Sequence, residues 1–293
     1  MASGDGTDAV RVVDRLEDAG LNALVYVDQR GQVQPAAWSR RVTLAQLAGT
    51  VGLLGCLGVL GWLIDGTAGV GLVGAMAVLA FRPLTVFFRM RRAATLLAAG
   101  QLDEADVLLR RARAGWGVPS TYKASIEKLL AHVAARRGRH AEALAFQESA
   151  LARMRNDTRW RAQRRMLEYS RVTMLVNLDR VREARAAFDA LPRALEGDYL
   201  RVQRTAVELY LLLGEGEHAL PRSFLEEQEE IALSLAAGAS LLLLLAWAED
   251  HSGRTAEADR LLAAAQVRPG GDVVRRVLPR LADWLEKRPS ARP

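Results

Sequence analysis

The sequence is poor in the residues that most often build covalent or metal-bound structure. Its 293 residues include a single cysteine, Cys56, which excludes an intrachain disulfide framework and a zinc cage made of cysteines. Four histidines are present, and they lie too far apart in the chain to indicate a metal cluster. These are His132, His140, His218 and His251. We therefore expect neither a bound metal nor a cofactor.

Charged residues are absent from a long stretch near the N-terminus. Residues 42–64 hold none over 23 positions. As a helix this stretch would extend about 34 Å, enough to cross the ~30 Å hydrocarbon core of a bilayer. A second apolar stretch, 68–88, follows a short polar turn that begins with Asp65. The pattern predicts a transmembrane helical hairpin over residues 42–88.

Basic residues flank both ends of this predicted hairpin, whereas its connecting turn carries only Asp65. Positive charge resists translocation, so both flanks are expected on the cytoplasmic side of the inner membrane. There the basic side chains would contact lipid headgroups. The candidate membrane-surface residues are Arg40, Arg41, Arg82, Arg89, Arg91 and Arg92.

The chain also lacks a recognisable catalytic constellation. The pattern Gly69-Val-Gly71-Leu-Val-Gly74 matches the glycine spacing of dinucleotide-binding turns, but it lies inside an apolar stretch and the next acid is Asp103. We therefore reject that site. None of the histidines in helical stretches has a plausible nucleophile partner, so enzymatic activity is not expected.

Residues 1–41 are too few for an independent domain of their own. Asp8 could cap a short helix that ends at Gly20, and residues 23–27 are typical of a strand, followed by a turn at 28–31. The pattern favours a small α/β segment made of a short helix and a possible β-hairpin.

A small-residue pattern recurs after residue 89. A glycine or aspartate is followed five residues later by an alanine, and these pairs repeat at intervals typical of stacked helix pairs. The glycine would let the chain turn sharply, and the alanine would let the two helices cross closely. The pairs are Gly100/Ala105, Gly138/Ala143, Asp179/Ala184, Gly214/Ala219 and Gly253/Ala258.

This pattern resembles the tetratricopeptide repeat (TPR) family. The segments that match best are 93–114, 128–152 and 241–265, while 170–191 and 207–227 depart from the family pattern. The resemblance implies a TPR-like α-solenoid. Residues 272–287 suit a terminal capping helix with a polar outer face.

One uncharged run leaves two alternatives open. Residues 231–248 are just long enough for a third membrane span, or they could form two buried helices of the solenoid. The second alternative is favoured, because membrane insertion would split a repeat that is otherwise intact.

The expected fold class is mainly α. It combines an N-terminal cytoplasmic α/β segment (1–41), a transmembrane hairpin (42–88) and a TPR-like repeat domain (89–293).

Positive charge collects in one part of the chain. Residues 82–171 contain 19 lysines and arginines against 8 aspartates and glutamates. A nucleic acid partner is nevertheless not expected, because no helix-turn-helix, zinc-finger or stacking-aromatic motif accompanies the charge. In the TPR family, the first helices of successive units line a concave groove, so the resemblance implies a groove for an acidic or aromatic segment of a protein partner. The candidate groove residues are Lys128, Tyr169, Arg201, Arg204 and Trp247.

These features together predict a membrane-anchored, non-enzymatic adaptor that binds protein partners through its helical repeats. The alternative is a structural or accessory subunit of a larger membrane complex, with the glycine-rich hairpin making the main contact.

Overall fold

The computed structural model describes Gly52 and most of the chain from residue 85 to residue 288. The described ranges are 85–97, 99–115, 118, 120–154, 161–192, 198–216, 220, 222–234, 239–266, 274 and 276–288. All regular structure in these ranges is helical.

The helices follow one another along the chain with short connections. Residues 85–97 form the first described helix of the array. The others are α4 (Leu102–Ala114), α5 (Ser120–Arg136), α6 (His140–Met154), α7 (Arg161–Asn177), α8 (Val181–Asp189), α9 (Asp198–Glu215), α10 (Arg222–Ser234), α11 (Ala239–His251), α12 (Thr255–Gln266) and α14 (Pro279–Lys287).

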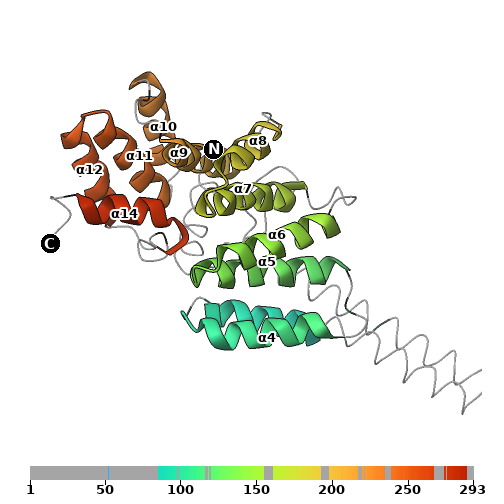
Figure 1. Cartoon of the computed structure of the whole chain (residues 1–293). Helices are drawn as coiled ribbons and strands as arrows, with labels where there is room; N and C mark the ends of the chain where they lie inside the picture. Colours follow the sequence, from blue (N-terminus) through green and yellow to red (C-terminus); the bar gives the residue numbers. More distant parts are fainter. Residues whose placement is uncertain are drawn as a thin grey trace, which may run out of the picture.

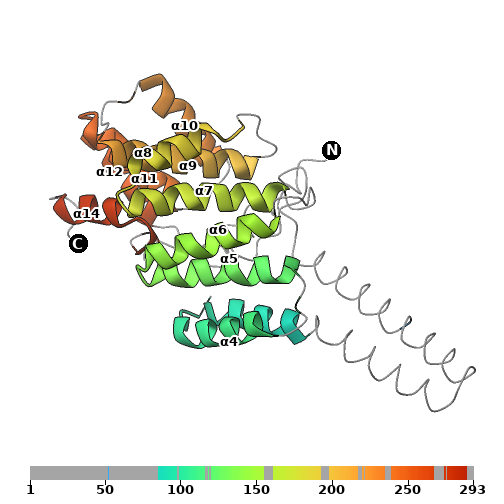
Figure 2. The ribbon, with the colours of Figure 1, turned by 45° about the vertical axis from the view of Figure 1, so that its right-hand side comes forward.

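Neighbouring helices pack in pairs, and the pairs stack into an elongated array. The closest packing joins α5 to α6 and α11 to α12, while α6 also contacts α7, and α7 contacts both α8 and α9. Figures 1 and 2 show the array running from α4 at one end to α12 and α14 at the other. Each pair buries its apolar side against its neighbours, as stacked helix pairs must.

The turns inside four of these pairs have the same backbone structure. Each turn residue has a positive φ, and the next N–H bonds back to a carbonyl five residues earlier at 2.9 Å. This is the Schellman arrangement, which satisfies the free carbonyls at a helix end. The four turn residues are Gly100, Gly138, Asp179 and Gly253. The sequence prediction of sharp turns at these positions is confirmed.

The alanine that follows each of these turns is fully enclosed. Ala105, Ala143, Ala184 and Ala258 all have 0% exposed surface. A larger side chain at any of them would push the two helices of a pair apart, because close-packed interiors leave no spare volume.

The fourth predicted turn, at Gly214, is wrong. Helix α9 continues to Glu215, and Gly216 takes the positive φ instead, at 78°. Gly214 has a different role, since a Cβ atom there would lie 2.8 Å from Cγ1 of Val176. At this point α9 packs closely against Val176 of α7. Ala219, the predicted partner of Gly214, lies outside the described residues.

The uncharged run at 231–248 does not form one helix among the described residues. Helix α10 ends at Ser234 and α11 begins at Ala239. The five consecutive leucines of α11, 241–245, are each at most 7% exposed and belong to the largest core cluster. Because α11 is covered on all sides by other helices, it needs no polar face.

The C-terminal segment folds back along the array instead of adding a further layer. Asn177 on α7 donates a hydrogen bond to the carbonyl of Val277 at 2.9 Å, and Arg280 pairs with Asp179 at 2.5 Å. Further along, the indole N–H of Trp284 donates to Asp250 at 2.9 Å. The segment therefore contacts the end of α7 and the turn after it, 100 and 101 residues earlier in sequence, and α11, 34 residues earlier.

The membrane part of the predicted fold class, and the predicted integral-membrane location, need correction. No helix among the described residues is long and apolar enough to cross a membrane. Of the predicted hairpin (42–88), only Gly52 and residues 85–88 are described. Residues 85–88 begin the helix that continues to residue 97, and its exposed arginines make that helix too polar for a span.

The α/β element of the predicted fold class is also corrected. The described residues contain helices and no strand. Residues 1–41, in which the short helix and β-hairpin were predicted, lie outside them, as do Arg40, Arg41 and Arg82.

Candidate binding face of helix α5

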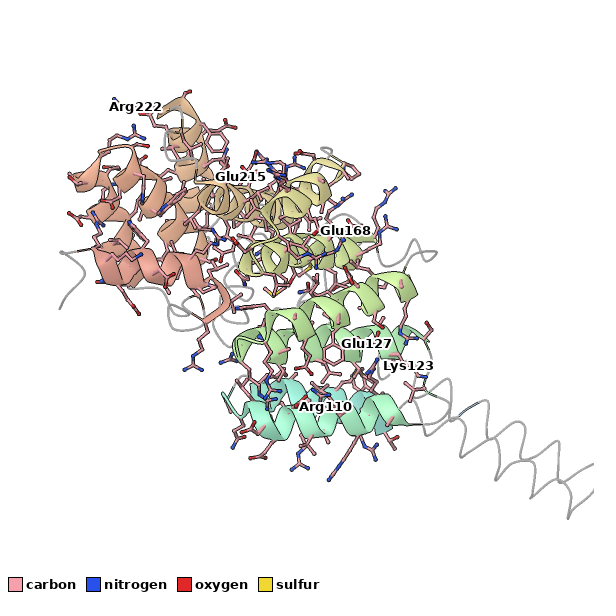
Figure 3. The ribbon with its side chains drawn as sticks, viewed as in Figure 1. Arg110, Lys123, Glu127, Glu168, Glu215 and Arg222 are labelled. Carbon is pink, nitrogen blue, oxygen red and sulfur yellow. The ribbon has the colours of Figure 1, made fainter. Side chains whose placement is uncertain are left out.

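Helix α5 carries an acidic residue, Glu127, directly followed by a basic residue, Lys128, and the two have different partners. Glu127 is 0% exposed, and its carboxylate accepts hydrogen bonds from Nε of Arg113 at 3.1 Å and from Nε of Arg153 at 2.8 Å. These partners belong to α4 and α6, so the carboxylate of Glu127, which is labelled in Figure 3, joins three helices. A buried charge that is paired and hydrogen-bonded in this way has a structural role.

Lys128, the next residue, is a cation without such a partner. It is partly buried, and its ammonium group donates a hydrogen bond to Oε1 of Gln163 on α7 at 2.6 Å. No carboxylate among the described residues forms an ion pair with it. Burial lowers the pKa of Lys128 to about 8, because desolvation penalises the charged form.

His132 and Arg136 continue the same row at intervals of four residues. Burial, together with the positive charges of Arg136 and Lys128, lowers the pKa of His132 to about 4. The buried Nε2 atom of His132 has no hydrogen-bond partner among the described residues. The guanidinium of Arg136 donates to the carbonyl of Leu97 at 2.8 Å, while its buried Nε is without a partner in the described part of the chain. Positions four apart lie on one side of a helix, so these three residues form a row, which we call the α5 row.

The α5 row contrasts with the arginines elsewhere in the array. Arg137 pairs with Asp106 at 2.8 Å, and Arg288 pairs with Asp250 and Asp259 at 3.1 Å each. Arg185 bonds to Glu215 across two helices. Most of the partly buried arginines that the structure describes have a carboxylate partner. The α5 row is a place where the described residues supply only neutral oxygen atoms.

Two of the predicted groove residues do not reach the surface. Tyr169 and Trp247 are each 2% exposed. Burial raises the pKa of Tyr169 against the opposing charges of Arg165 and Arg204, and Trp247 packs 5.1 Å from the ring of His251. The prediction that these rings contact a partner is corrected: both are core residues, because adjacent helix pairs close over them.

The other predicted groove residues lie on different parts of the array. Arg201 is exposed on α9. Arg204 is partly buried, with its guanidinium 4.8 Å from the centre of the Phe188 ring and one N–H donating to the carbonyl of Pro192 at 3.4 Å. Of the predicted groove set, Lys128 alone lies in the α5 row, whereas Arg204 on α9 lies close enough to Tyr169 to influence its pKa.

Three of the predicted membrane-surface residues are described. Arg89, Arg91 and Arg92 are exposed on the helix formed by residues 85–97. That helix is the first of the described array and packs against α4 through Val86, Leu97 and Leu109.

Sequence reasoning missed the role of Arg136 and of the C-terminal segment. The spacing of Lys128, His132 and Arg136 was the one available signal, because residues four apart share a helix side. Nothing in the local sequence indicates that Asn177 contacts Val277 or that Arg280 contacts Asp179.

The described residues contain no group of three His, Cys, Asp or Glu side chains that could hold a metal ion. The α5 row instead carries the cations Lys128 and Arg136 beside the neutral imidazole of His132, and the two cations suit an anionic group. No protein-family model, curated protein or solved structure matches the chain.

Proposed function

We propose that this protein is a non-enzymatic, TPR-like scaffold that binds an acidic segment of a protein partner along the α5 row. The observation that carries the proposal is the contrast between Lys128 and its neighbour Glu127. The glutamate has two guanidinium partners, and the lysine has one neutral amide oxygen. A partner carboxylate is the complement that the described residues do not supply.

The physical argument rests on the cost of desolvating a cation. An ammonium group removed from water without a counter-ion loses free energy that a single neutral hydrogen bond does not recover. A carboxylate placed beside Lys128 would offset that cost and would form a charge-assisted hydrogen bond. Lys128 is partly buried, so water would screen such a pair less than a pair at an open surface.

The geometry of the row favours an extended peptide over a small anion. Lys128 and Arg136 are eight residues apart on one helix, which is about 12 Å along its axis. In an extended chain, side chains four residues apart point the same way and lie about 13 Å from one another. Two glutamates with that spacing could reach both ends of the row.

The test is a binding titration with the full chain. A fluorescein-labelled decapeptide with glutamates at alternate positions is compared with the same peptide carrying glutamines, by fluorescence anisotropy at low and at moderate salt. We expect the glutamate peptide to bind and the glutamine peptide to bind at least tenfold more weakly, with affinity falling as salt rises.

Helix α5 offers a matched control. Lys123 lies on the same helix, one turn before Glu127, without belonging to the row (Figure 3). K128Q should weaken peptide binding at least tenfold, K128R should retain most of it, and K123Q should change it less than twofold. Equal binding of the two peptides, no binding of the glutamate peptide, or equal effects of K128Q and K123Q would overturn the proposal.

A further inference from the structure

The segment before α14 runs to the helix ends beside the α5 row. Asn177 donates to the carbonyl of Val277 at 2.9 Å, and the same amide group lies 3.3 Å from Nδ1 of His140. His140 begins α6, four residues after Arg136 ends α5. These contacts place Arg276, which directly precedes Val277, next to the C-terminal end of α5.

Two guanidinium groups therefore approach each other at this end of the row. Arg136 is partly buried and Arg276 is exposed. Burial lowers the pKa of Arg136, and the positive charge of Arg276 adds to that effect. In the described part of the chain, neither residue forms an ion pair with a carboxylate, and the Nε atom of Arg136 has no hydrogen-bond partner.

The other two arginines that the structure describes in the C-terminal segment are held differently. Arg280 pairs with Asp179 at 2.5 Å and donates to the carbonyl of Gly214 at 3.2 Å. Arg288 is 8% exposed and pairs with two aspartates. These two arginines fasten the segment to the array, so Arg276 is not needed for attachment. Its position beside another cation costs free energy unless an anion lies between them.

We propose that Arg136 and Arg276 form an anion subsite for a carboxylate of the acidic partner segment, so that the C-terminal segment completes the binding face begun by Lys128. This inference rests on the proposed function, and it adds that helix α5 and the C-terminal segment meet the partner together. A guanidinium pair can bind one carboxylate with several N–H donors, which favours a carboxylate over a neutral group.

The bound segment should carry its carboxylates at a defined spacing. A first carboxylate at Lys128 and a second between Arg136 and Arg276 requires about 12 Å between them. Decapeptides with two glutamates four residues apart should therefore bind more tightly than peptides with two adjacent glutamates, although both carry the same charge.

The decisive variant is R276E in the full chain, because it places a tethered carboxylate beside Arg136. We expect this variant to raise the thermal unfolding midpoint by a few degrees and to weaken binding of the glutamate peptide at least fivefold, since its own carboxylate competes. R276Q should weaken binding by a smaller factor and raise the midpoint less than R276E does, because it removes the repulsion between the two guanidiniums without adding a carboxylate.

The matched control is K287E, which changes the net charge of the same segment equally. Lys287 is exposed at the end of α14. K287E should leave the midpoint and the affinity within experimental error of the original chain. The subsite proposal would be overturned if R276E bound the glutamate peptide as tightly as K287E does. It would also be overturned if R276E lowered the thermal unfolding midpoint.

The two proposals fail in different ways. If the original chain does not bind the glutamate peptide, the proposed function fails and the subsite fails with it. If the chain binds, and K128Q weakens binding while R276E and the spacing of the glutamates have no effect, the subsite alone fails.

Discussion

The charged residues on the two sides of helix α5 differ in whether the described part of the chain supplies a partner of opposite charge. On one side, Glu127 is enclosed by Arg113 and Arg153 and joins α4, α5 and α6. On the other side, Lys128 meets only the amide of Gln163. A charge whose partners are all within the chain contributes to the fold. A charge left beside neutral atoms lowers the stability of the fold and is available to a ligand. This contrast separates residues that hold the array together from residues that could give it a function.

The largest expected effect on folding stability comes from removing the charge of Glu127, which pairs with two arginines. E127Q keeps the shape of the side chain and removes its charge, so two guanidiniums lose their common partner. We expect the free energy of unfolding to fall by about 3 kcal/mol. The measurement is urea unfolding followed by circular dichroism at 222 nm.

The matched control for this variant is E104Q, which changes an exposed glutamate on α4. Its effect should stay within about 0.5 kcal/mol, as is usual for surface substitutions. If E127Q and E104Q destabilise equally, the three-helix role of Glu127 is wrong.

The second prediction concerns His132 in the α5 row and the dependence of folding stability on pH. The folded-state pKa of His132 is lowered to about 4 from an ordinary value of 6.5, so the unfolded chain binds more protons between these values. Stability should therefore be full above pH 6.5 and fall as the pH is lowered toward 4, with His132 contributing on the order of 2 kcal/mol of the loss.

Other groups titrate in the same pH range, so the effect of His132 is isolated by comparing the original chain with a variant that lacks this histidine. Unfolding free energies of the original chain and of H132Q are measured at pH 7, 6 and 5. The gap between them should shift in favour of H132Q as the pH falls. A gap that does not change with pH would show that His132 is not enclosed as described.

The third prediction compares the effect on stability of removing the charge of Lys128 with that of removing the charge of its neighbour Glu127. The folded-state pKa of Lys128 is lowered to about 8 from 10.5, so at pH 7 the buried ammonium costs stability. K128Q removes that charge and can still donate a hydrogen bond to Gln163. We expect unfolding free energy to rise by about 1 kcal/mol, opposite in sign to the effect of E127Q. A loss of stability from K128Q in the same urea experiment would contradict this assignment.

The smallest expected effect is that of R113Q. The Arg113 side chain is 42% exposed, and Arg153 remains as a second partner for Glu127. The variant should therefore cost about 0.5 kcal/mol. The double variant R113Q/R153Q, measured in the same way, should cost more than the sum of the two single variants, since it leaves Glu127 buried without a partner.

The turns were open to prediction because their causes are local. Gly100, Gly138 and Gly253 can adopt a positive φ without strain, and aspartate tolerates it at position 179. Gly214 was misassigned for the same reason that the others were right: the pattern Gly-x4-Ala takes account of neighbours along the chain only. The contact of Gly214 with Val176 depends on how α9 approaches α7.

The candidate site was predicted in part. Lys128 was identified from its place in a first helix of the TPR-like pattern, but Tyr169 and Trp247 were placed on the surface and are 2% exposed. Aromatic residues suit a core and a binding surface equally well, so residue type alone does not distinguish them. Burial depends on which helix pair packs over each ring.

The sequence by itself determined that the described chain is helical, and it determined where most helix pairs turn. These properties depend on backbone conformation and on hydrogen bonds between residues at most five positions apart. The tertiary structure alone decided which charges are paired. Glu127 meets a residue 26 positions away, Lys128 one 35 positions away, and Arg280 one 101 positions away. The chain brings such groups together only when the stacked helices bury their apolar sides, because that packing sets which side chains face each other and which are left for a partner.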